Sequence, residues 1–151
     1  MIKYIDGDLV RDAEQYDVIT HGCNCFCTMG KGIALQIKKK FPEAYEVDKK
    51  TKWGDKSKLG TISFTTNTTP IIVNSYTQYS FGSYMFGGRD LDYMAVKTAM
   101  MEIKKNFSGK KIAMSKIGSS LGGGDWEVTK RIIEEILGDE DVTIINFIQQ
   151  N

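Results

Sequence analysis

Residues 18–42 read VITHGCNCFCTMGKGIALQIKKKFP, and this stretch decides the type of fold. It begins within a strand-like run at 16–21 that is rich in β-branched residues, and it then passes through a loop with two glycines. After the loop, apolar residues recur four positions apart over 33–41, which is the spacing of a helix face, and Pro42 ends this run. A strand, a glycine loop and a helix in this order are typical of an α/β fold.

The rest of the chain repeats this alternation of strand and helix. Strands are also predicted, from short runs rich in β-branched and aromatic residues, at 2–7, 60–67, 70–78, 110–118 and 141–148. Helices are also predicted at 42–53, 91–107 and 125–138. This order predicts one α/β sandwich domain with a mostly parallel or mixed sheet. In such sheets, ligands bind in the crevice beyond the carboxyl ends of the strands.

The helix predicted at 91–107 is rich in methionine. Its spacing places Met94, Met101 and Ile103 near one face, and Met100 extends that face. Methionine is a flexible apolar residue that fills gaps in protein cores, so we interpret these methionines as core residues and not as a cofactor site.

Composition and charge exclude several classes of protein. The chain has 151 residues, of which 41% are hydrophobic and 26% are charged, as in an ordinary soluble domain. No apolar run reaches the roughly 20 residues of a membrane helix, and Asp6 and Asp8 lie where a secretory signal stays apolar. The formal net charge of +1 gives no strong nucleic-acid signal, and we interpret the lysine runs at 37–41 and 48–58 as solvated helix faces.

The histidine and the three cysteines allow alternative interpretations. Cys23, Cys25 and Cys27 are separated by single residues, and the chain has no second pair of cysteines or histidines, so a tetrahedral zinc site is not expected. His21 would share one side of an extended segment with Cys23 and Cys25, which leaves a thiol nucleophile open. We favour small buried cysteines at a strand end, in a reducing cytoplasmic compartment.

Two glycine clusters, Gly30–Gly32 and Gly118–Gly124, each connect a predicted strand to a predicted helix. Free backbone N–H groups at a helix N-terminus bind phosphates with the help of the helix dipole. Neither cluster has the Walker A pattern or a GxGxxG dinucleotide pattern. Two such loops at one crevice suit a ligand with two linked phosphates, whereas the plainer alternative is that the glycines only make turns.

Four segments, taken in order, resemble the macro domains, a family that binds ADP-ribose. The segments are YIDGDLV (4–10), VITHGCNCFCTMGKGIALQIKKKFP (18–42), PIIVNSYTQYSFG (70–82) and MSKIGSSLGGGDWEVTKRII (114–133). The resemblance covers nearly the whole chain. It implies a single macro domain over 1–151, with a three-layer α/β/α sandwich around a central mixed sheet.

The resemblance also implies ligand contacts residue by residue. Asp8 is expected to accept the adenine amino group, Leu9 to add a nearby backbone contact, and Asn24 to bind the distal ribose. Backbone contacts to the distal ribose and the diphosphate are implied for Gly30, Lys31, Gly32, Ile33, Ser119, Ser120, Leu121, Gly122 and Gly123. Without the family match, Asp8 is better explained as a turn residue that caps its own backbone.

Within the family, His21 resembles the class that dephosphorylates ADP-ribose 1''-phosphate in yeast and bacteriophages. One hydrolase class carries a lysine after the central strand, but 74–78 contain no lysine, and Gly122 replaces its partner aspartate. Because histidine titrates near neutral pH, we expect His21 to act as a catalytic acid or base or to orient water. A carboxylate at Asp90 or Asp92 is expected to assist it.

Two further residues have alternative roles. Asp125 is either the assisting carboxylate or the cap of the last helix, and Arg89 is either a phosphate ligand or a solvated loop residue.

The resemblance implies no cofactor and no metal. The expected protein is a monomer that binds ADP-ribose or its 1''-phosphate, in the host cytoplasm if a phage encodes it. The alternatives are a binding module without catalysis and a hydrolase that removes ADP-ribose from protein or nucleic acid.

Overall fold

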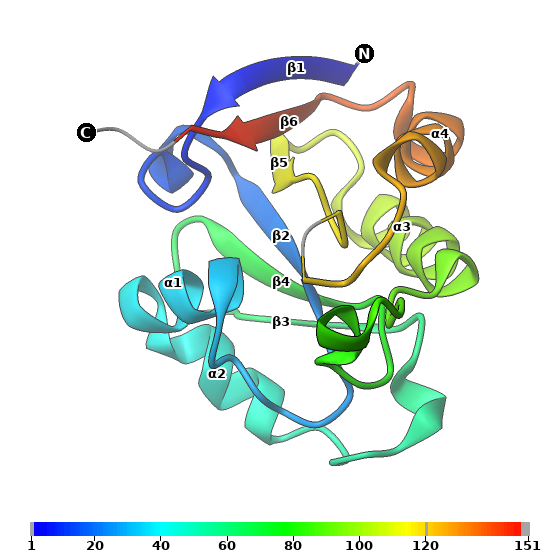
Figure 1. Cartoon of the computed structure of the whole chain (residues 1–151). Coiled ribbons are helices and arrows are strands. Elements are labelled where there is room, and N and C mark those ends of the chain that lie inside the picture. Colours follow the sequence, from blue (N-terminus) through cyan, green and yellow to red (C-terminus); the bar gives the residue numbers. More distant parts are fainter. Residues whose placement is uncertain (1, 120, 149–151) are drawn as a thin grey trace.

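The computed structural model describes residues 2–119 and 121–148 (Figure 1), and a six-stranded sheet lies at its centre. The strands are β1 (Ile2–Gly7), β2 (Val18–Cys23), β3 (Ile62–Phe64), β4 (Ile71–Tyr76), β5 (Ile112–Ser115) and β6 (Val142–Phe147). Their order is β1-β6-β5-β2-β4-β3, and all neighbours pair in parallel except β3, which pairs antiparallel with β4 at one edge. The prediction of a mixed sheet is therefore confirmed.

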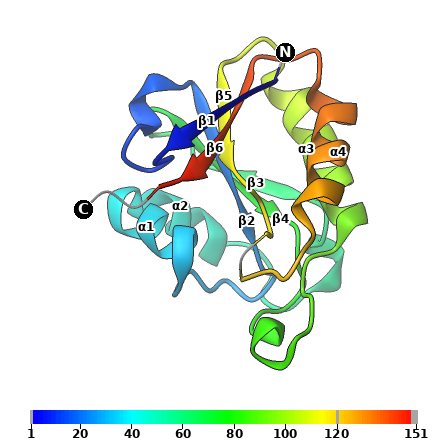
Figure 2. The ribbon, with the colours of Figure 1, turned by 45° about the horizontal axis from the view of Figure 1, so that its top comes forward.

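Helices cover both faces of this sheet. They are α1 (Gly32–Lys40), α2 (Pro42–Lys49), α3 (Tyr93–Phe107) and α4 (Trp126–Leu137), with short 3-10 turns η1 (Ala13–Gln15), η2 (Lys56–Lys58) and η3 (Ser83–Phe86). The tilted view shows α1 and α2 on one side of the strands and α3 and α4 on the other (Figure 2). This arrangement is the predicted α/β/α sandwich. None of the helices in the described ranges is long and apolar enough to cross a membrane.

The alternation of side chains along β2 divides the core into two parts. Val18 belongs to the cluster that contains Ile103 and Ile133 of α3 and α4. Ile19 belongs to the cluster that contains Ile37 of α1. Because successive strand residues point to opposite faces, the side chain of His21 lies on the same face as that of Ile19, beneath α1 and α2.

The methionine prediction for α3 is wrong at two positions. Met94 and Met101 are 65% and 50% exposed, whereas Met100 and Ile103 are fully buried. The buried face of α3 runs through Ala95, Val96, Ala99, Met100, Ile103 and Phe107, as the helix periodicity allows. The predicted face is therefore right at Met100 and Ile103 and wrong at Met94 and Met101.

Some element boundaries also differ from those predicted. Pro42 occupies the first turn of α2 as expected, but this helix ends at Lys49 and not at residue 53. The chain then turns through residues 51–54, where Gly54 has a φ of +70°. The strand predicted at 60–67 is only Ile62–Phe64 in the structure.

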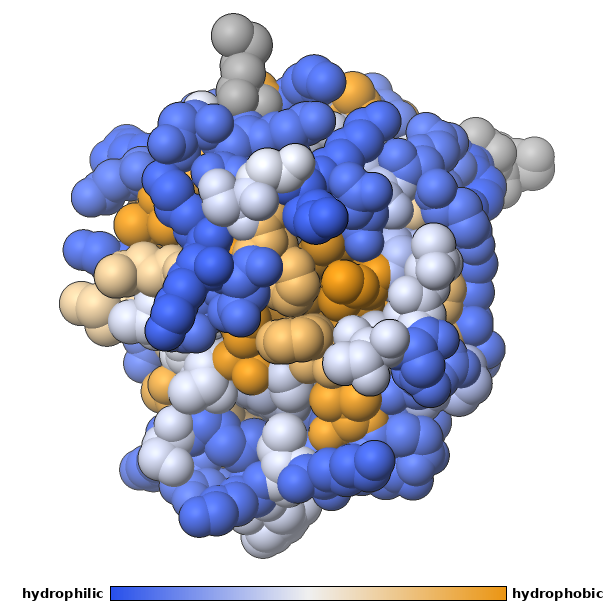
Figure 3. Space-filling model, turned by 180° about the vertical axis from the view of Figure 1, so that it is seen from behind, coloured by the Kyte–Doolittle hydropathy of each residue, from blue (hydrophilic) through white to orange (hydrophobic). Residues whose placement is uncertain are grey.

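The side of the molecule opposite to the view of Figure 1 carries a central group of apolar side chains with polar side chains around it (Figure 3). Apolar residues at the β3 edge of the sheet are half-buried, and Ile62 and Phe64 pack against the core under α3. The rings of Phe64 and Phe107 meet edge to face with centroids 5.1 Å apart.

Candidate functional site

A cleft of about 1360 Å³ lies at the carboxyl ends of the parallel strands. Its walls are the loops that follow β1, β2 and β5, the end of β6, one face of α1, and η3 with the segment that leads into it. Both glycine loops contribute to it. The prediction that the two loops line one crevice beyond the strand ends is therefore confirmed.

Most residues that the family resemblance selected line this cleft. They are Asp8, Leu9, Asn24, Gly30, Lys31, Gly32, Ile33, Ser119, Leu121 and Gly122. Gly123 is outside the lining, and Ser120 lies outside the described residues. The individual contacts of these residues with a ligand stay predictions.

The first loop ends at a helix N-terminus that no side chain caps. Lys31 is the N-cap of α1 and makes no side-chain capping hydrogen bond, and the first turn carries no acidic residue. The first-turn N–H groups of an α-helix have no partner within the helix, so those of Gly32, Ile33 and Ala34 are available to an anion. These three residues line the cleft.

The second loop depends on glycine for its close packing. Gly118 has a φ of +72°, and a Cβ there would lie 2.5 Å from the Leu91 side chain. A Cβ on Gly122 would lie 3.0 Å from Gly118 Cα. The two loops also approach each other, because a Cβ on Gly32 would lie 3.2 Å from Leu121 Cδ1. Leu121 therefore closes the second loop over the start of α1.

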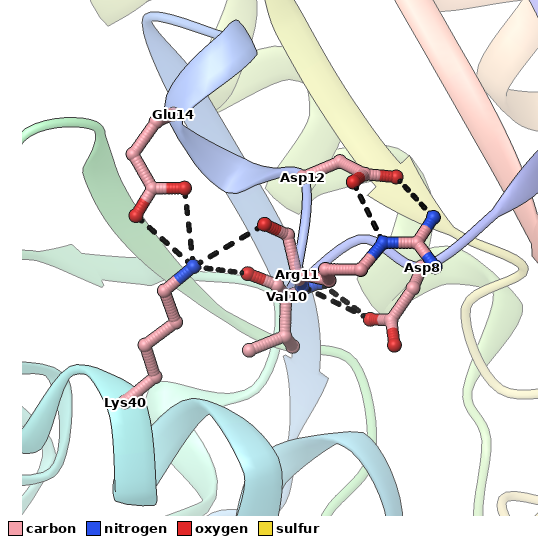
Figure 4. A network of polar contacts seen from close by, with 6 residues as sticks. All are labelled: Asp8, Val10, Arg11, Asp12, Glu14 and Lys40. Carbon is pink, nitrogen blue, oxygen red and sulfur yellow. Dashed lines mark hydrogen bonds and ion pairs between the residues drawn. The ribbon is translucent and has the colours of Figure 1, made fainter.

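The loop after β1 is held by a polar network (Figure 4). The Asp8 carboxylate accepts hydrogen bonds from the N–H groups of Val10 and Arg11, both at 3.1 Å. From α1, Lys40 Nζ donates to the Val10 carbonyl at 2.7 Å and pairs with Glu14 at 3.0 Å. Asp8 is thus the turn-capping residue that the residues alone suggested, and it also lines the cleft, as the family resemblance requires.

The charges around the cleft favour an anion. The described lining residues include one carboxylate, Asp8, and no histidine. The basic lining residues are Arg11 and Lys40, which pair with Asp12 and Glu14 outside the lining, and Lys31, Lys39 and Lys116. Such an excess of positive charge at one concave site concentrates anionic ligands.

Asn24 lines the cleft and organises the first loop. Its side chain is only 9% exposed. The amide oxygen accepts from Phe26 N–H at 2.8 Å, and the amide nitrogen donates to the Thr28 hydroxyl at 2.7 Å. Asn24 therefore fixes the loop backbone in addition to any contact with a ligand.

His21 is fully buried and is not part of the lining. Its Nε2 lies 2.7 Å from Asn74 Oδ1. The Asn74 amide nitrogen donates to the Ala44 carbonyl at 3.0 Å and to the Ser63 hydroxyl at 3.1 Å, which identifies Oδ1 as the acceptor. His21 Nε2 therefore carries the proton. Burial lowers the pKa of His21 from 6.5 to about 4, although the Asn74 hydrogen bond opposes this change.

The position of His21 does not suit a base that touches the substrate. Between it and the cleft lies Cys23, whose sulfur is 3.5 Å from His21 Nε2 and which lines the cleft. The catalytic role of His21 stays a prediction, but the observed contacts favour a positioning role at the end of β2.

The two carboxylates that were predicted to assist His21 also have structural partners. Asp90 accepts hydrogen bonds from the Ser83 N–H at 2.9 Å and the Ser83 hydroxyl at 2.6 Å, and it therefore holds η3. Asp92 accepts from the Ala95 N–H at 3.0 Å and caps α3. Neither carboxylate lines the cleft, so the predicted assistance remains without support from this geometry.

The two residues with alternative roles make contacts that fit the plainer role. Asp125 is the N-cap of α4, where its side chain accepts from the Glu127 N–H at 3.0 Å. Arg89 is exposed, and its guanidinium lies 4.4 Å from the centroid of the Tyr93 ring.

The cysteines behave as packing residues. Cys23 and Cys25 are 5% and 0% exposed, all three cysteines are free, and Cys27 is partly buried. Burial raises the pKa of the Cys23 thiol well above its usual value, so it is protonated and a poor nucleophile. Within the described ranges, no group of three or more histidine, cysteine or acidic residues is arranged to hold a metal ion.

Several lining residues were missed at the sequence level. Gln78, Tyr84 and Phe147 line the cleft from the β4 loop, from η3 and from the end of β6. Gln78 and Phe147 lie at the ends of strands, so the predicted strand boundaries alone could have identified them as lining residues. Tyr84 carried no signal, because it reaches the cleft only through the folding of η3, where its hydroxyl lies 3.5 Å from Lys31 Nζ of the first loop.

Fold and site together define an α/β/α domain with an anion-binding cleft at the carboxyl edge of its sheet. The chain belongs to the Macro domain family, whose sequence pattern matches residues 20–133.

Similar proteins from several organisms share nearly the full length of this chain. An uncharacterized protein from the tk-vs intergenic region of Enterobacteria phage T4 is 34% identical over 97% of each chain. The ADP-ribose 1''-phosphate phosphatase of Saccharomyces cerevisiae is 24% identical over 95% of this chain and 97% of that protein. A DNA ADP-ribosyl glycohydrolase of Mycobacterium tuberculosis is 28% identical, and the match covers 95% of this chain and 42% of that protein.

A solved structure confirms the architecture. A protein of unknown function from Bacteroides thetaiotaomicron is 30% identical, with a TM-score of 0.78 over 97% of this chain and 98% of that one.

Proposed function

We propose that the protein binds ADP-ribose in the cleft and hydrolyses the phosphate monoester of ADP-ribose 1''-phosphate. Membership of the macro domain family and the similarity to the yeast phosphatase support this assignment. In the reaction, water adds to phosphorus and the bond between phosphorus and the anomeric oxygen breaks. The products are ADP-ribose, which takes a proton from water, and inorganic phosphate.

The observation that carries the proposal is the uncapped N-terminus of α1 opposite the second glycine loop. Gly32 and Leu121 bring the two loops together over one stretch of the cleft. Backbone N–H groups at such a position hold phosphate oxygens without a charged side chain. In this arrangement the adenine of the ligand lies at the loop of Asp8, which Lys40 holds in place. The distal ribose lies toward Asn24.

We propose that electrostatic stabilisation supplies most of the catalysis. The described lining residues offer no histidine, and their one carboxylate, Asp8, lies at the adenine end. Preorganised N–H groups that face developing negative charge are worth a factor of about 100 to 1,000 each in acyl-transfer enzymes. His21 would act indirectly by fixing Cys23 and the start of the Asn24 loop.

The test is an assay of inorganic phosphate release from ADP-ribose 1''-phosphate by the wild type and two glycine variants. Gly32→Ala places a methyl group in the cleft at a residue with a φ of +58°. Gly109→Ala imposes the same kind of backbone strain at a φ of +85°, with no neighbouring atom within 4 Å and outside the cleft lining.

Both variants should lose about 1 to 2 kcal/mol of stability, but only Gly32→Ala should lose at least about tenfold in kcat/KM. If the wild type binds ADP-ribose by calorimetry and releases no phosphate, the protein is a binding module and the phosphatase assignment is wrong. Equal activity of the two variants would show that the N-terminus of α1 is not part of the ligand site.

A second candidate is removal of ADP-ribose from DNA, which the similarity to the mycobacterial glycohydrolase favours. Release of ADP-ribose from an ADP-ribosylated oligonucleotide, without phosphate release from the first substrate, would select it. The absence of a lysine from 74–78 speaks against the lysine-based hydrolase mechanism.

A further inference from the structure

An aromatic surface, formed by Phe26, Trp53 and Tyr79, lies beside the cleft and outside its lining. The Phe26 ring packs edge to face against both other rings, with centroids 5.0 Å from Trp53 and 4.9 Å from Tyr79. Trp53 is nevertheless 71% exposed. A large aromatic ring that packs against one neighbouring ring and is otherwise left open to solvent is available for a partner.

The segment that carries Trp53 is fixed to the protein. Gly54 N–H donates to the Cys25 carbonyl at 2.7 Å, and the Tyr79 hydroxyl donates to the Gly54 carbonyl at 2.8 Å. Cys25 N–H donates in turn to the Tyr79 carbonyl at 2.9 Å, and the buried Lys58 ammonium donates to the Cys25 carbonyl at 3.1 Å. Trp53 is therefore exposed on a turn that hydrogen bonds hold in place.

Positive charge surrounds this aromatic surface. Residues 49–58 contain five lysines and one acidic residue, Asp55. Lys50, Lys52 and Lys56 are exposed, and Lys56 Nζ lies 5.1 Å from the centroid of the Tyr79 ring. The segment predicted to be a solvated helix face is thus a lysine-rich turn around an exposed indole.

We propose that the aromatic surface and its lysines bind single-stranded nucleic acid. Trp53 stacks on a base, while Lys50, Lys52 and Lys56 contact phosphates. Exposed aromatic rings among lysines suit this partner, because every unpaired base offers a flat face and its backbone carries regular negative charge. A duplex hides its base faces within the stack, so it cannot use the exposed indole in this way.

The surface adjoins the cleft through two short connections. Phe26 lies in the same loop as Asn24, and Tyr79 directly follows Gln78; both Asn24 and Gln78 line the cleft. A bound strand would therefore pass the end of the cleft opposite the loop of Asp8. The binding itself makes no use of ADP-ribose and does not depend on the proposed hydrolysis.

The experiment uses a fluorescein-labelled oligodeoxythymidine of about 12 nucleotides, within the range of such sites. The chain has two tryptophans, Trp53 and Trp126. In the Trp126→Phe variant, the oligonucleotide should quench the remaining fluorescence of Trp53. By anisotropy, Trp53→Ala should bind about 5- to 150-fold more weakly than the wild type, which is the loss expected for one stacked base. Trp53→Phe should recover part of the affinity.

Charge provides a second readout that does not depend on stacking. The double variant Lys52→Gln, Lys56→Gln should reduce the slope of log affinity against log salt by about 1.4, or about 0.7 for each single-strand phosphate contact. Because the side chains of Trp53, Lys52 and Lys56 are exposed, the variants at these positions are expected to fold, and thermal unfolding will verify this.

Three outcomes would overturn the proposal. The first is that the wild type shows no binding even at low salt. The second is that Trp53→Ala, or a duplex of the same length, binds as tightly as the wild type binds the single strand. The third is that saturating ADP-ribose displaces the oligonucleotide, which would place the strand in the cleft and not on the aromatic surface. Retention of the oligonucleotide in saturating ADP-ribose supports two separate sites.

Discussion

Acidification should destabilise this protein through His21, and the structure sets the size of the effect. Burial lowers the pKa of His21 from 6.5 to about 4 in the folded state. Between these two pH values the unfolded chain binds more protons than the folded protein. The free energy of unfolding therefore falls as the pH falls through this window. The full difference between the two pKa values corresponds to about 3 kcal/mol of unfolding free energy, and about 2 kcal/mol of this is lost by about pH 5.

The assay is urea unfolding of the wild type and His21→Gln at about pH 7.5 and about pH 5. Gln can donate from its amide nitrogen to Asn74 Oδ1, as His21 Nε2 does at 2.7 Å, and it does not titrate. Carboxylates titrate in both proteins, so the difference between the two pH dependences isolates His21. We expect the wild type to lose about 2 kcal/mol more than the variant over this interval.

Nuclear magnetic resonance gives an independent measurement, because the chain contains one histidine and its ring signal is therefore unambiguous. The signal should stay that of a neutral ring until the pH approaches about 4. A midpoint near 6.5, together with equal pH dependence of the two proteins, would refute the burial argument. His21 would then be accessible and would regain the role of a base in contact with substrate.

Three further predictions concern the walls of the cleft. Gly118→Ala should cost about 2 to 4 kcal/mol in urea unfolding, because the new Cβ meets Leu91 at 2.5 Å and the residue has a φ of +72°; a loss below about 0.5 kcal/mol would show that the loop rearranges freely. Asp90→Ala should speed amide exchange at Ser83 by roughly tenfold, because two hydrogen bonds to that residue are lost, and unchanged exchange would contradict this anchor. Lys40→Met should weaken ADP-ribose binding by about 3- to 10-fold in calorimetry, since the loop after β1 loses its tie to α1; unchanged affinity would show that the loop needs no such tie.

The fold was largely predictable, because its signals are local. The strand, glycine loop and helix over 18–42 appear in the structure as β2, the first loop and α1. Periodicity located the helices but not their faces or ends. Met101 has the same hydrophobicity as Met100, and only the packing of α3 on the sheet decides that Met100 is buried and Met101 is exposed.

The cleft was predictable where it is made of backbone, since glycines next to strand ends mark loops that approach a ligand. Side-chain roles were less predictable, and His21 is the clearest example. The sequence shows a histidine at the end of a strand, but not that Asn74 of the neighbouring strand binds it there. Its burial beneath α1 and α2 is a long-range property, and a histidine motif alone does not contain that information.

The same limit applies to the lysine-rich segment at 48–58, where the consequence for function is larger. As a helix, this segment would present its lysines to solvent, and Trp53 would be an isolated surface residue. Because α2 ends at Lys49, the chain turns back toward the β2 loop, and Gly54 bonds to Cys25. This turn places the Trp53 ring against Phe26. A segment whose pattern is typical of a solvated helix face thereby forms part of an aromatic surface beside the cleft. The contacts that build this surface join it to a segment about 27 residues earlier in the chain.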